Sequence, residues 1–195
     1  MSNYPFLSSA FLDSLENSGS VGTNTGWLPA HLKLNDSAGN SAFMPTYVKT
    51  HSFGEYVFDW AWADAYQRNG LDYYPKLVSA IPFSPATGPR VVFSGKGDRQ
   101  QACQSLFQAA RELADAEQAH SWHLLFPDAQ TLDWFKHPEL MLRTGVQYHW
   151  LNRDYESFEH FLSTFASRKR KMVKRERRRV SEQGLDVEEV LEALI

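Results

Sequence analysis

A helical segment over residues 98–118, set between strand-like runs at 90–94 and 121–126, constrains the fold more than any other feature of the sequence. Asp98 precedes the helix and is a good N-cap residue. The apolar stripe of this segment recurs at helical spacing, at Ala102, Leu106, Ala110 and Leu113. Helices that alternate with strands favour a layered α/β domain built around a mixed sheet.

The rest of the chain extends this alternation. The sequence predicts helices at 6–18, from about 55 to 68, at 128–136 and from 155 into a basic segment, and strands at 27–34, 42–50 and 146–151. Turn-forming residues at 35–40 predict a β-hairpin between the first two strands. Residues 71–89 are rich in proline, which donates no backbone hydrogen bond, so an ordered loop is predicted there rather than the centre of a sheet.

The run from His51 to Tyr66 combines aromatic residues with three carboxylates. If it is helical from Glu55, one face carries a stripe at i, i+4, i+7 and i+11, formed by Glu55, Asp59, Trp62 and Tyr66. Burying such acids without partners costs free energy, and proteins commonly tolerate this cost at sites that bind a polar ligand. The alternative is that Asp59 caps a helix and the aromatic residues belong to the core.

Polar and aromatic residues on both sides of this run provide donors and acceptors for a ligand that bears amines, carboxylates or phosphates. The predicted substrate-binding residues are Lys49, His51, Trp62, Tyr66, Tyr73, Tyr74, Lys76 and Arg90. A second interpretation is that these groups pair with one another and only stabilise the loop.

The net charge of −3 conceals a sharp division of charge. Residues 168–179 hold nine of the 20 Lys and Arg residues and one acid, so this segment is +8 and the remainder is −11. Three interpretations remain open: a helix that connects two halves of a protein, a phosphate-binding segment, and a contact with an anionic membrane, for which the helix lacks a large apolar face. We expect a domain at 1–165 and a basic helix within 166–195.

Several other classes of site have no support in the sequence. The seven histidines and Cys103 show no metal-ligand spacing, and no Gly-x-Ser-x-Gly motif is present. We expect Cys103 to be a small buried residue, and the histidines to have surface or capping roles. A single cysteine, the lack of an apolar run long enough to span a membrane, and the lack of a secretory signal predict a cytoplasmic protein.

The order of several motifs resembles a bacterial family of N-acyltransferases, described as peptidoglycan biosynthesis or recognition proteins and similar to the FemAB transferases of the GNAT superfamily. These motifs are Pro45-Thr46-Tyr47-Val48-Lys49, the run from His51 to Tyr56, Tyr73-Tyr74-Pro75-Lys76-Leu77, Ile81-Pro82-Phe83-Ser84-Pro85 and Gly88-Pro89-Arg90. The resemblance covers residues 5–185. It implies a GNAT-like mixed β-sheet flanked by helices, and the first of two such halves, with the second half as a partner. The apolar end at 187–195 has no stop signal and fits a chain that continues.

The resemblance also implies a chemistry. Glu55 or Asp59 becomes the candidate catalytic base, and a cell-wall precursor becomes the candidate amine acceptor. Gly95 and Gly97, before a helix N-terminus, are the candidate site for the pyrophosphate of acyl-CoA, although the fuller glycine loop of GNAT enzymes is missing. Aminoacyl-tRNA is the other candidate acyl donor. The alternative function is a non-catalytic module that recognises a cell-wall precursor or a polyanion such as RNA; nucleic acid is the less expected partner.

Overall fold

The structure, a computed structural model, describes residues 4–185, so the apolar end at 187–195 lies outside the described residues. The chain divides into a first unit, Met1–Gly145, and a second unit, Val146–Ile195. Two sheets flanked by helices make the first unit an α/β structure, as predicted. Among the described residues, no helix is both long and apolar enough to cross a membrane.

The N-terminal helix has the predicted position. A short 3-10 helix, Pro5–Leu7, leads into α1 (Ser9–Asn17), whose N-cap residue Ser8 accepts a hydrogen bond from the Phe11 amide. Leu7 and Leu12 are buried, and Leu15 packs against the core beside the first sheet. The apolar spacing of this segment therefore predicted both the helix and the face that it buries.

The predicted hairpin is confirmed, but each of its long strands is divided in two. The outer parts β1 (Trp27–Pro29) and β4 (Tyr47–Lys49) pair in one sheet, and the inner parts β2 (Leu32–Asn35) and β3 (Ser41–Met44) pair in another. At the break, Pro45 has no amide hydrogen to donate, and the Thr46 amide donates to Nδ1 of His31 (3.1 Å) instead of to a strand. The ladder is interrupted there, and one hairpin contributes to two sheets.

The first sheet is mixed, with strand order β1-β4-β5-β7. Its strand β5 (Lys76–Ser79) lies between antiparallel β4 and parallel β7 (Trp122–Leu124). All four residues of β5 are buried. The prediction of a loop throughout 71–89 is therefore wrong at this strand. This short strand begins with a buried lysine. It therefore shows neither the alternation of apolar and polar residues that is typical of a half-exposed strand nor the continuous apolar run of a buried one, and the sequence pattern did not indicate it.

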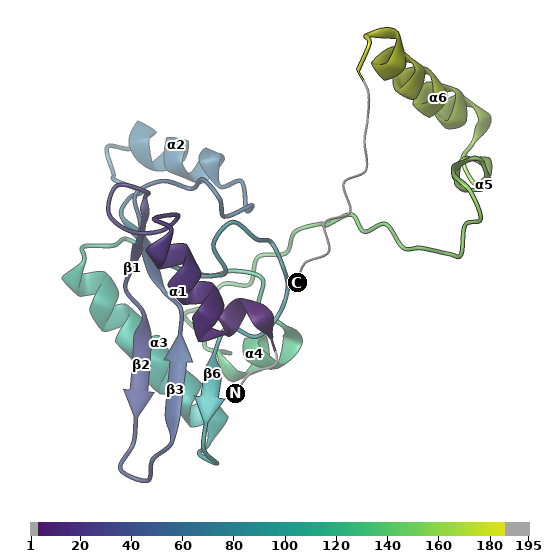
Figure 1. The fold of residues 1–195 in the computed structure, drawn as a ribbon. Coiled ribbons are helices and arrows are strands. Elements are labelled where there is room, and N and C mark those ends of the chain that lie inside the picture. The colour runs from purple at the N-terminus through teal and green to yellow at the C-terminus, as the bar shows by residue number, and fades with distance from the viewer. Residues whose placement is uncertain (1–3, 186–195) are drawn as a thin grey trace. The chain divides into compact units, whose positions relative to one another are not determined.

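The second sheet is antiparallel, with order β2-β3-β6, where β6 is Val92–Ser94. The long helix α3 (Arg99–Ala116) runs beside β2 and β3 (Figure 1). Asp98 caps it as predicted, accepting hydrogen bonds from the Gln100 and Gln101 amides. Between sheet and helix lies a core that includes Met44, Leu106 and Cys103, which is buried as expected.

Two further helices of the first unit were predicted. The short helix α4 (Ala129–Trp134) is capped by Asp128, which accepts from the Thr131 amide (2.7 Å). The aromatic helix α2 (Trp60–Arg68) ends as expected, with Gly70 at a positive φ of 70° just after it. Helix α2 begins at Trp60, however, so the prediction of a helix from Glu55 is wrong.

In the second unit, the predicted strand at 146–151 is not formed, and these residues have no regular secondary structure. The predicted continuous helix is divided into α5 (Phe158–Ser163) and α6 (Ser167–Glu182). All nine cations of the basic segment lie in α6, as predicted for a basic helix. The two compact units meet between residues 145 and 146, and the expected domain boundary between 165 and 166 stays a prediction.

Candidate functional site

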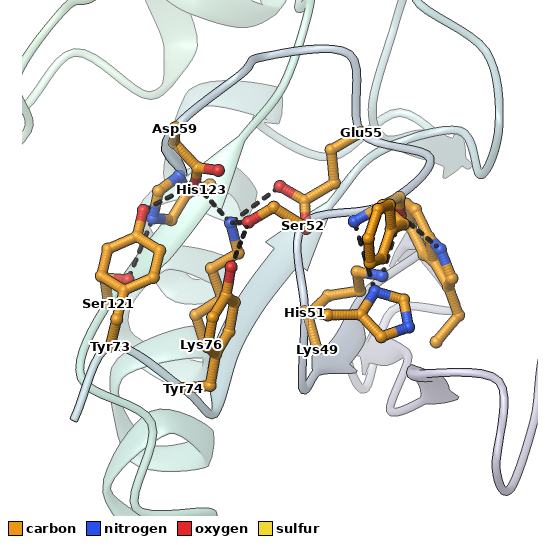
Figure 2. Close-up of polar contacts among 12 residues, drawn as sticks. Lys49, His51, Ser52, Glu55, Asp59, Tyr73, Tyr74, Lys76, Ser121 and His123 are labelled. Atoms are coloured by element: carbon orange, nitrogen blue, oxygen red, sulfur yellow. Dashed lines mark hydrogen bonds and ion pairs between the residues drawn. The ribbon is translucent and has the colours of Figure 1, made fainter. Parts of the chain in front are cut away.

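A buried ammonium group is the centre of the candidate site. Lys76, the first residue of β5, is completely buried. Its Nζ donates hydrogen bonds to Glu55 Oε2 (2.8 Å), Asp59 Oδ2 (2.6 Å) and Ser52 Oγ (2.8 Å), as Figure 2 shows. An ammonium group has three N–H donors, and here all three have acceptors. We call Lys76, Ser52, Glu55, Asp59 and the two tyrosines described below the Lys76 cluster.

The two carboxylates reach Lys76 from the loop between β4 and α2 rather than from one helical face. Glu55 lies in this loop, and Asp59 is the residue just before α2. The Asp59 side chain makes no capping hydrogen bond to α2. Asp59 thus occupies the N-cap position of α2, as one interpretation expected, but its carboxylate is directed to Lys76. The other interpretation, a helical stripe that begins at Glu55, is wrong. The two acids do converge, and they do so on a cation from the sheet.

Two tyrosines complete the cluster. The Tyr73 hydroxyl donates to Asp59 Oδ2 (2.6 Å), and the Tyr74 hydroxyl is hydrogen-bonded to Ser52 Oγ (2.7 Å). Both rings lie near the ammonium group, with centroids 5.1 Å and 5.7 Å from Lys76 Nζ. Aromatic faces at this distance attract a cation. The Lys76 charge is therefore balanced by two acids and two ring faces without water access to the lysine.

The cluster moves the pKa values of its two acids in opposite directions. Burial favours the neutral acid and raises the pKa of Glu55, against the attraction of Lys76. Burial acts on Asp59 as well, but the hydrogen bonds that this carboxylate accepts, first from Lys76, outweigh it and lower the pKa of Asp59 to about 2. Each acid keeps one buried oxygen without a hydrogen-bond partner, Glu55 Oε1 and Asp59 Oδ1. Glu55 is thus the more readily protonated of the pair.

Lys49 and His51 hold the same loop from its other side. Lys49 Nζ lies 3.8 Å from the centroid of the Trp27 ring and donates to the Phe53 carbonyl (3.3 Å). Burial lowers the pKa of Lys49 to about 7. His51 Nε2 is 3.1 Å from the Thr25 carbonyl, and its Nδ1 accepts from the Phe53 amide (3.2 Å). Both residues are thereby occupied by the protein itself, as the loop-stabilising interpretation expects.

Gly26 makes room for His51. At its φ of 71°, a conformation that L residues rarely adopt, a Cβ atom would lie 2.0 Å from His51 Nε2. Any other residue at this position would displace the histidine and, with it, the support for the loop at Phe53.

The sequence failed to identify Ser52 and His123 as members of this region. His123 lies in β7, paired in register with Val78 of β5. Its ring is perpendicular to that of Tyr73 (centroids 6.4 Å apart), and its Nε2 is 2.9 Å from Ser121 Oγ. Burial, together with the positive charge of Lys76, lowers the pKa of His123 to about 4. Only the parallel pairing of β5 and β7 reveals this proximity, and no local pattern indicates it.

The remaining predicted substrate residues are not members of the Lys76 cluster. Trp62 is exposed on α2, and Tyr66 packs against the Tyr73 ring (5.2 Å between centroids). Arg90 is buried, and its guanidinium donates to main-chain carbonyls, among them those of Leu125 (2.7 Å) and Gly88 (3.0 Å). Arg90 therefore fixes two loops, and the structure does not bring it to the Lys76 cluster.

Gly95 and Gly97 adjoin a hollow of about 390 Å³ between the second sheet and the start of α3. The amides of Lys96 and Gly97 both donate to Asn40 Oδ1 (2.8 and 3.1 Å). The donors that would hold a pyrophosphate are thus already paired, and Asp98 adds negative charge at the same place. Binding of CoA at this loop stays a prediction.

The loop that supplies the two acids turns its aromatic residues outward. Phe53 and Phe58 are 65% and 73% exposed, while Glu55 and Asp59 between and beside them are buried. Tyr56 and Phe58 have positive φ values of 60° and 49°, which are unfavourable for bulky residues. The cluster beneath therefore anchors a loop that presents aromatic rings to solvent.

Comparison with known families gives a match over nearly the whole chain. A family model described as FemAB-like, peptidoglycan biosynthesis/recognition, matches residues 1–194. Comparison with curated proteins and with solved structures finds no significant match. The family match spans almost the whole sequence, including both the Lys76 cluster and the basic helix α6. The chain therefore belongs to the FemAB-like family of peptidoglycan biosynthesis or recognition proteins.

Proposed function

We propose that this chain is the acceptor-binding half of a GNAT-like N-acyltransferase that modifies an amine of a peptidoglycan precursor. The observation that carries the proposal is the family match over residues 1–194, which implies a peptidoglycan-related, acyltransferase-like role. The mixed sheet with its parallel pair β5 and β7 is compatible with a GNAT-like half. The cytoplasm, where activated acyl donors and precursors are both available, is the proposed location.

The proposed reaction needs few groups from the protein. The acceptor amine attacks the carbonyl carbon of an ester or thioester, the amine loses a proton, and the tRNA hydroxyl or CoA thiol leaves with a proton as the amide forms. Positioning of the amine and removal of its proton are the steps that protein side chains assist. The family favours aminoacyl-tRNA as the donor over acyl-CoA.

Within the Lys76 cluster, Glu55 is the proposed base. Its raised pKa distinguishes Glu55 from Asp59, whose low pKa makes it the firmer partner of Lys76. Two carboxyl groups whose pKa values are driven apart often divide such roles between them. Glu55 is 2% exposed, so the proposal requires the loop at 50–59 to lift from Lys76 before the amine can reach it.

The test is binding and turnover with a muropeptide fragment that has a free amine. The wild-type chain is expected to bind the fragment, and Glu55→Gln is expected to weaken binding or abolish any transfer that the chain supports. Phe58→Ser, on the exposed part of the loop, is expected to weaken binding without changing stability. Acetyl-CoA alone is not expected to be turned over. Fast acetyl transfer by this chain, unaffected by Glu55→Gln, would contradict the proposal.

A second candidate function is a recognition module without catalysis. The observation in its favour is that the cluster is buried, that all three donors of Lys76 already have acceptors, and that the amides near Gly95 already have partners. Such a module would bind the same muropeptide through the exposed aromatic residues of the loop. Fragment binding that is lost in Phe58→Ser but unchanged in Glu55→Gln would select this alternative.

A further inference from the structure

Helix α6 uses one of its faces within the second unit. Lys174 Nζ lies 2.5 Å from Glu159 Oε2 of α5, and the Arg177 guanidinium lies 4.1 Å from the centroid of the Phe158 ring. Lys174 and Arg177 are three residues apart and so lie on the same face. This side of α6 therefore packs on α5.

A second, adjoining side of α6 carries a stripe of cations. Arg168, Lys171, Arg175 and Arg179 follow one another at i, i+3, i+7 and i+11, which places them on one side of the helix over roughly 16 Å. All four are exposed, and among the described residues none of them forms an ion pair with a carboxylate. Like charges at these spacings repel one another, so an external anionic surface would stabilise the stripe.

The same unit also exposes apolar side chains. The segment before α5 leaves Val146, Tyr148, Trp150 and Leu151 between 65% and 97% exposed. Within the cationic stripe, Met172 is 37% exposed. The segment that was predicted as a strand at 146–151 thus exposes apolar side chains, although the Trp150 ring also contacts the rings of Tyr155 and Phe161 (centroids 6.3 and 6.2 Å apart).

We propose that residues 146–182 form a docking surface for anionic phospholipid membranes. Lys and Arg near a membrane are attracted to its negative headgroups, and Tyr and Trp settle at the level of the headgroups. Aliphatic groups such as Val146, Leu151 and Met172 gain from burial at the acyl boundary. They would gain nothing from a nucleic acid, where cations bind phosphates and rings stack on bases. The protein would attach to the membrane surface without crossing it, and this attachment is independent of the proposed acyl transfer.

The test is co-sedimentation of the full 195-residue chain with vesicles of phosphatidylcholine, with and without phosphatidylglycerol. Binding is expected only with phosphatidylglycerol, and it should weaken steeply with salt. Replacing the four stripe cations by glutamine should lower the partition coefficient by about a hundred-fold or more. The matched control removes four exposed cations of the first unit, through Lys33→Gln, Lys96→Gln, Lys136→Gln and Arg143→Gln, and should bind almost as the wild type does.

A second variant separates membrane docking from simple charge attraction. Tyr148→Ser should weaken vesicle binding several-fold while leaving its salt dependence unchanged, because it removes an interfacial ring and no charge. Binding that requires both the stripe and Tyr148 supports the proposal. Equal binding to neutral vesicles, or to the stripe variant, would overturn it. So would binding to RNA of mixed sequence with no binding to anionic vesicles, which would assign the stripe to phosphates of nucleic acid instead.

Discussion

The Lys76 cluster and helix α6 both concentrate charge, but the cluster buries and pairs its charges whereas most of the charges of α6 are exposed. Lys76 is fully buried and contacts two carboxylates, a hydroxyl and two aromatic rings. Helix α6 holds nine cations, and the side chains of its outward stripe remain exposed. The buried charges are costly to separate because no water replaces a lost partner, whereas each exposed charge is screened. Single substitutions should therefore be severe in the first region and mild in the second.

The largest effect is expected for Lys76→Met. Removing the ammonium leaves Glu55 and Asp59 buried without their cation, which costs about 3–5 kcal/mol in similar cases. We expect the free energy of unfolding, measured by urea titration with circular dichroism, to fall by that amount. Lys33→Met, an exposed lysine on β2, is the control and should change stability by about 0.5 kcal/mol or less. A loss of stability in Lys76→Met as small as that in Lys33→Met would contradict the difference expected between buried and exposed charges.

A second large effect is an acid sensitivity that depends on His123. Its pKa is about 4 in the folded protein against 6.5 for an unperturbed histidine, so the unfolded chain binds more protons between these values. The stability that His123 contributes is present above pH 6.5 and is lost as the pH falls towards 4, by up to about 3 kcal/mol. Unfolding titrations across this range should show the slope in the wild type and a flatter curve in His123→Gln. His120 is exposed, and His120→Gln is the control, which should keep the wild-type slope. A curve that is flat in His120→Gln and unchanged in His123→Gln would contradict the assignment of the effect to His123.

A smaller effect separates the two acids. Asp59 has a pKa lowered from 3.8 to about 2, so the stability it contributes is present above pH 3.8 and is lost as the pH falls towards 2. Asp59→Asn should cost about 2 kcal/mol at neutral pH. The pKa of Glu55 is raised, so its contribution is present below its unfolded pKa of 4.5 and is lost as the pH rises through the folded value. Glu55→Gln should therefore cost less at pH 7 than Asp59→Asn, and equal costs would show that the two acids are equivalent.

The smallest effect belongs to the basic helix. Arg175→Gln removes one cation from the exposed stripe, where its main interactions are repulsions along the helix. We expect a change in the free energy of unfolding of no more than about 0.5 kcal/mol, and of either sign. Thermal denaturation at low and high salt provides the measurement. A loss comparable to that of Asp59→Asn would mean that the stripe is part of the folded core.

Much of the fold followed from local patterns in the sequence. Helix α3 and its cap Asp98, the turn after Asp36 and the end of α2 at Gly70 depend on contacts within a few residues, and each was predicted. Strand β5 was missed because its neighbour β7 is distant in sequence, so that no local pattern indicates the pairing. In addition, a lysine at its first position is typical of an exposed segment and not of a buried strand. The prediction of a strand at 146–151 failed for the related reason that a strand needs a partner.

The site was predicted in part. The sequence identified Glu55 and Asp59 as acids that need partners, and it identified Lys76, Tyr73 and Tyr74 as groups near them. It gave the wrong geometry, because a helical face was assumed where a loop carries the acids to the sheet. It also missed Ser52 and His123, since nothing in a single sequence states which side chains two paired strands bring together. Trp62 and Tyr66, the aromatic residues of the predicted stripe, lie instead on helix α2, where Trp62 is exposed and Tyr66 packs against Tyr73.

The most direct test of the account is the stability of a compensated cluster. Lys76→Met, Glu55→Gln and Asp59→Asn combined remove the cation and both negative charges, and leave groups of similar size. If the buried charges act mainly on one another, urea unfolding of this triple variant should recover most of the stability that Lys76→Met alone loses. A triple variant that is less stable than Lys76→Met by the summed cost of the two amide substitutions would contradict the account, because the three side chains would then act independently.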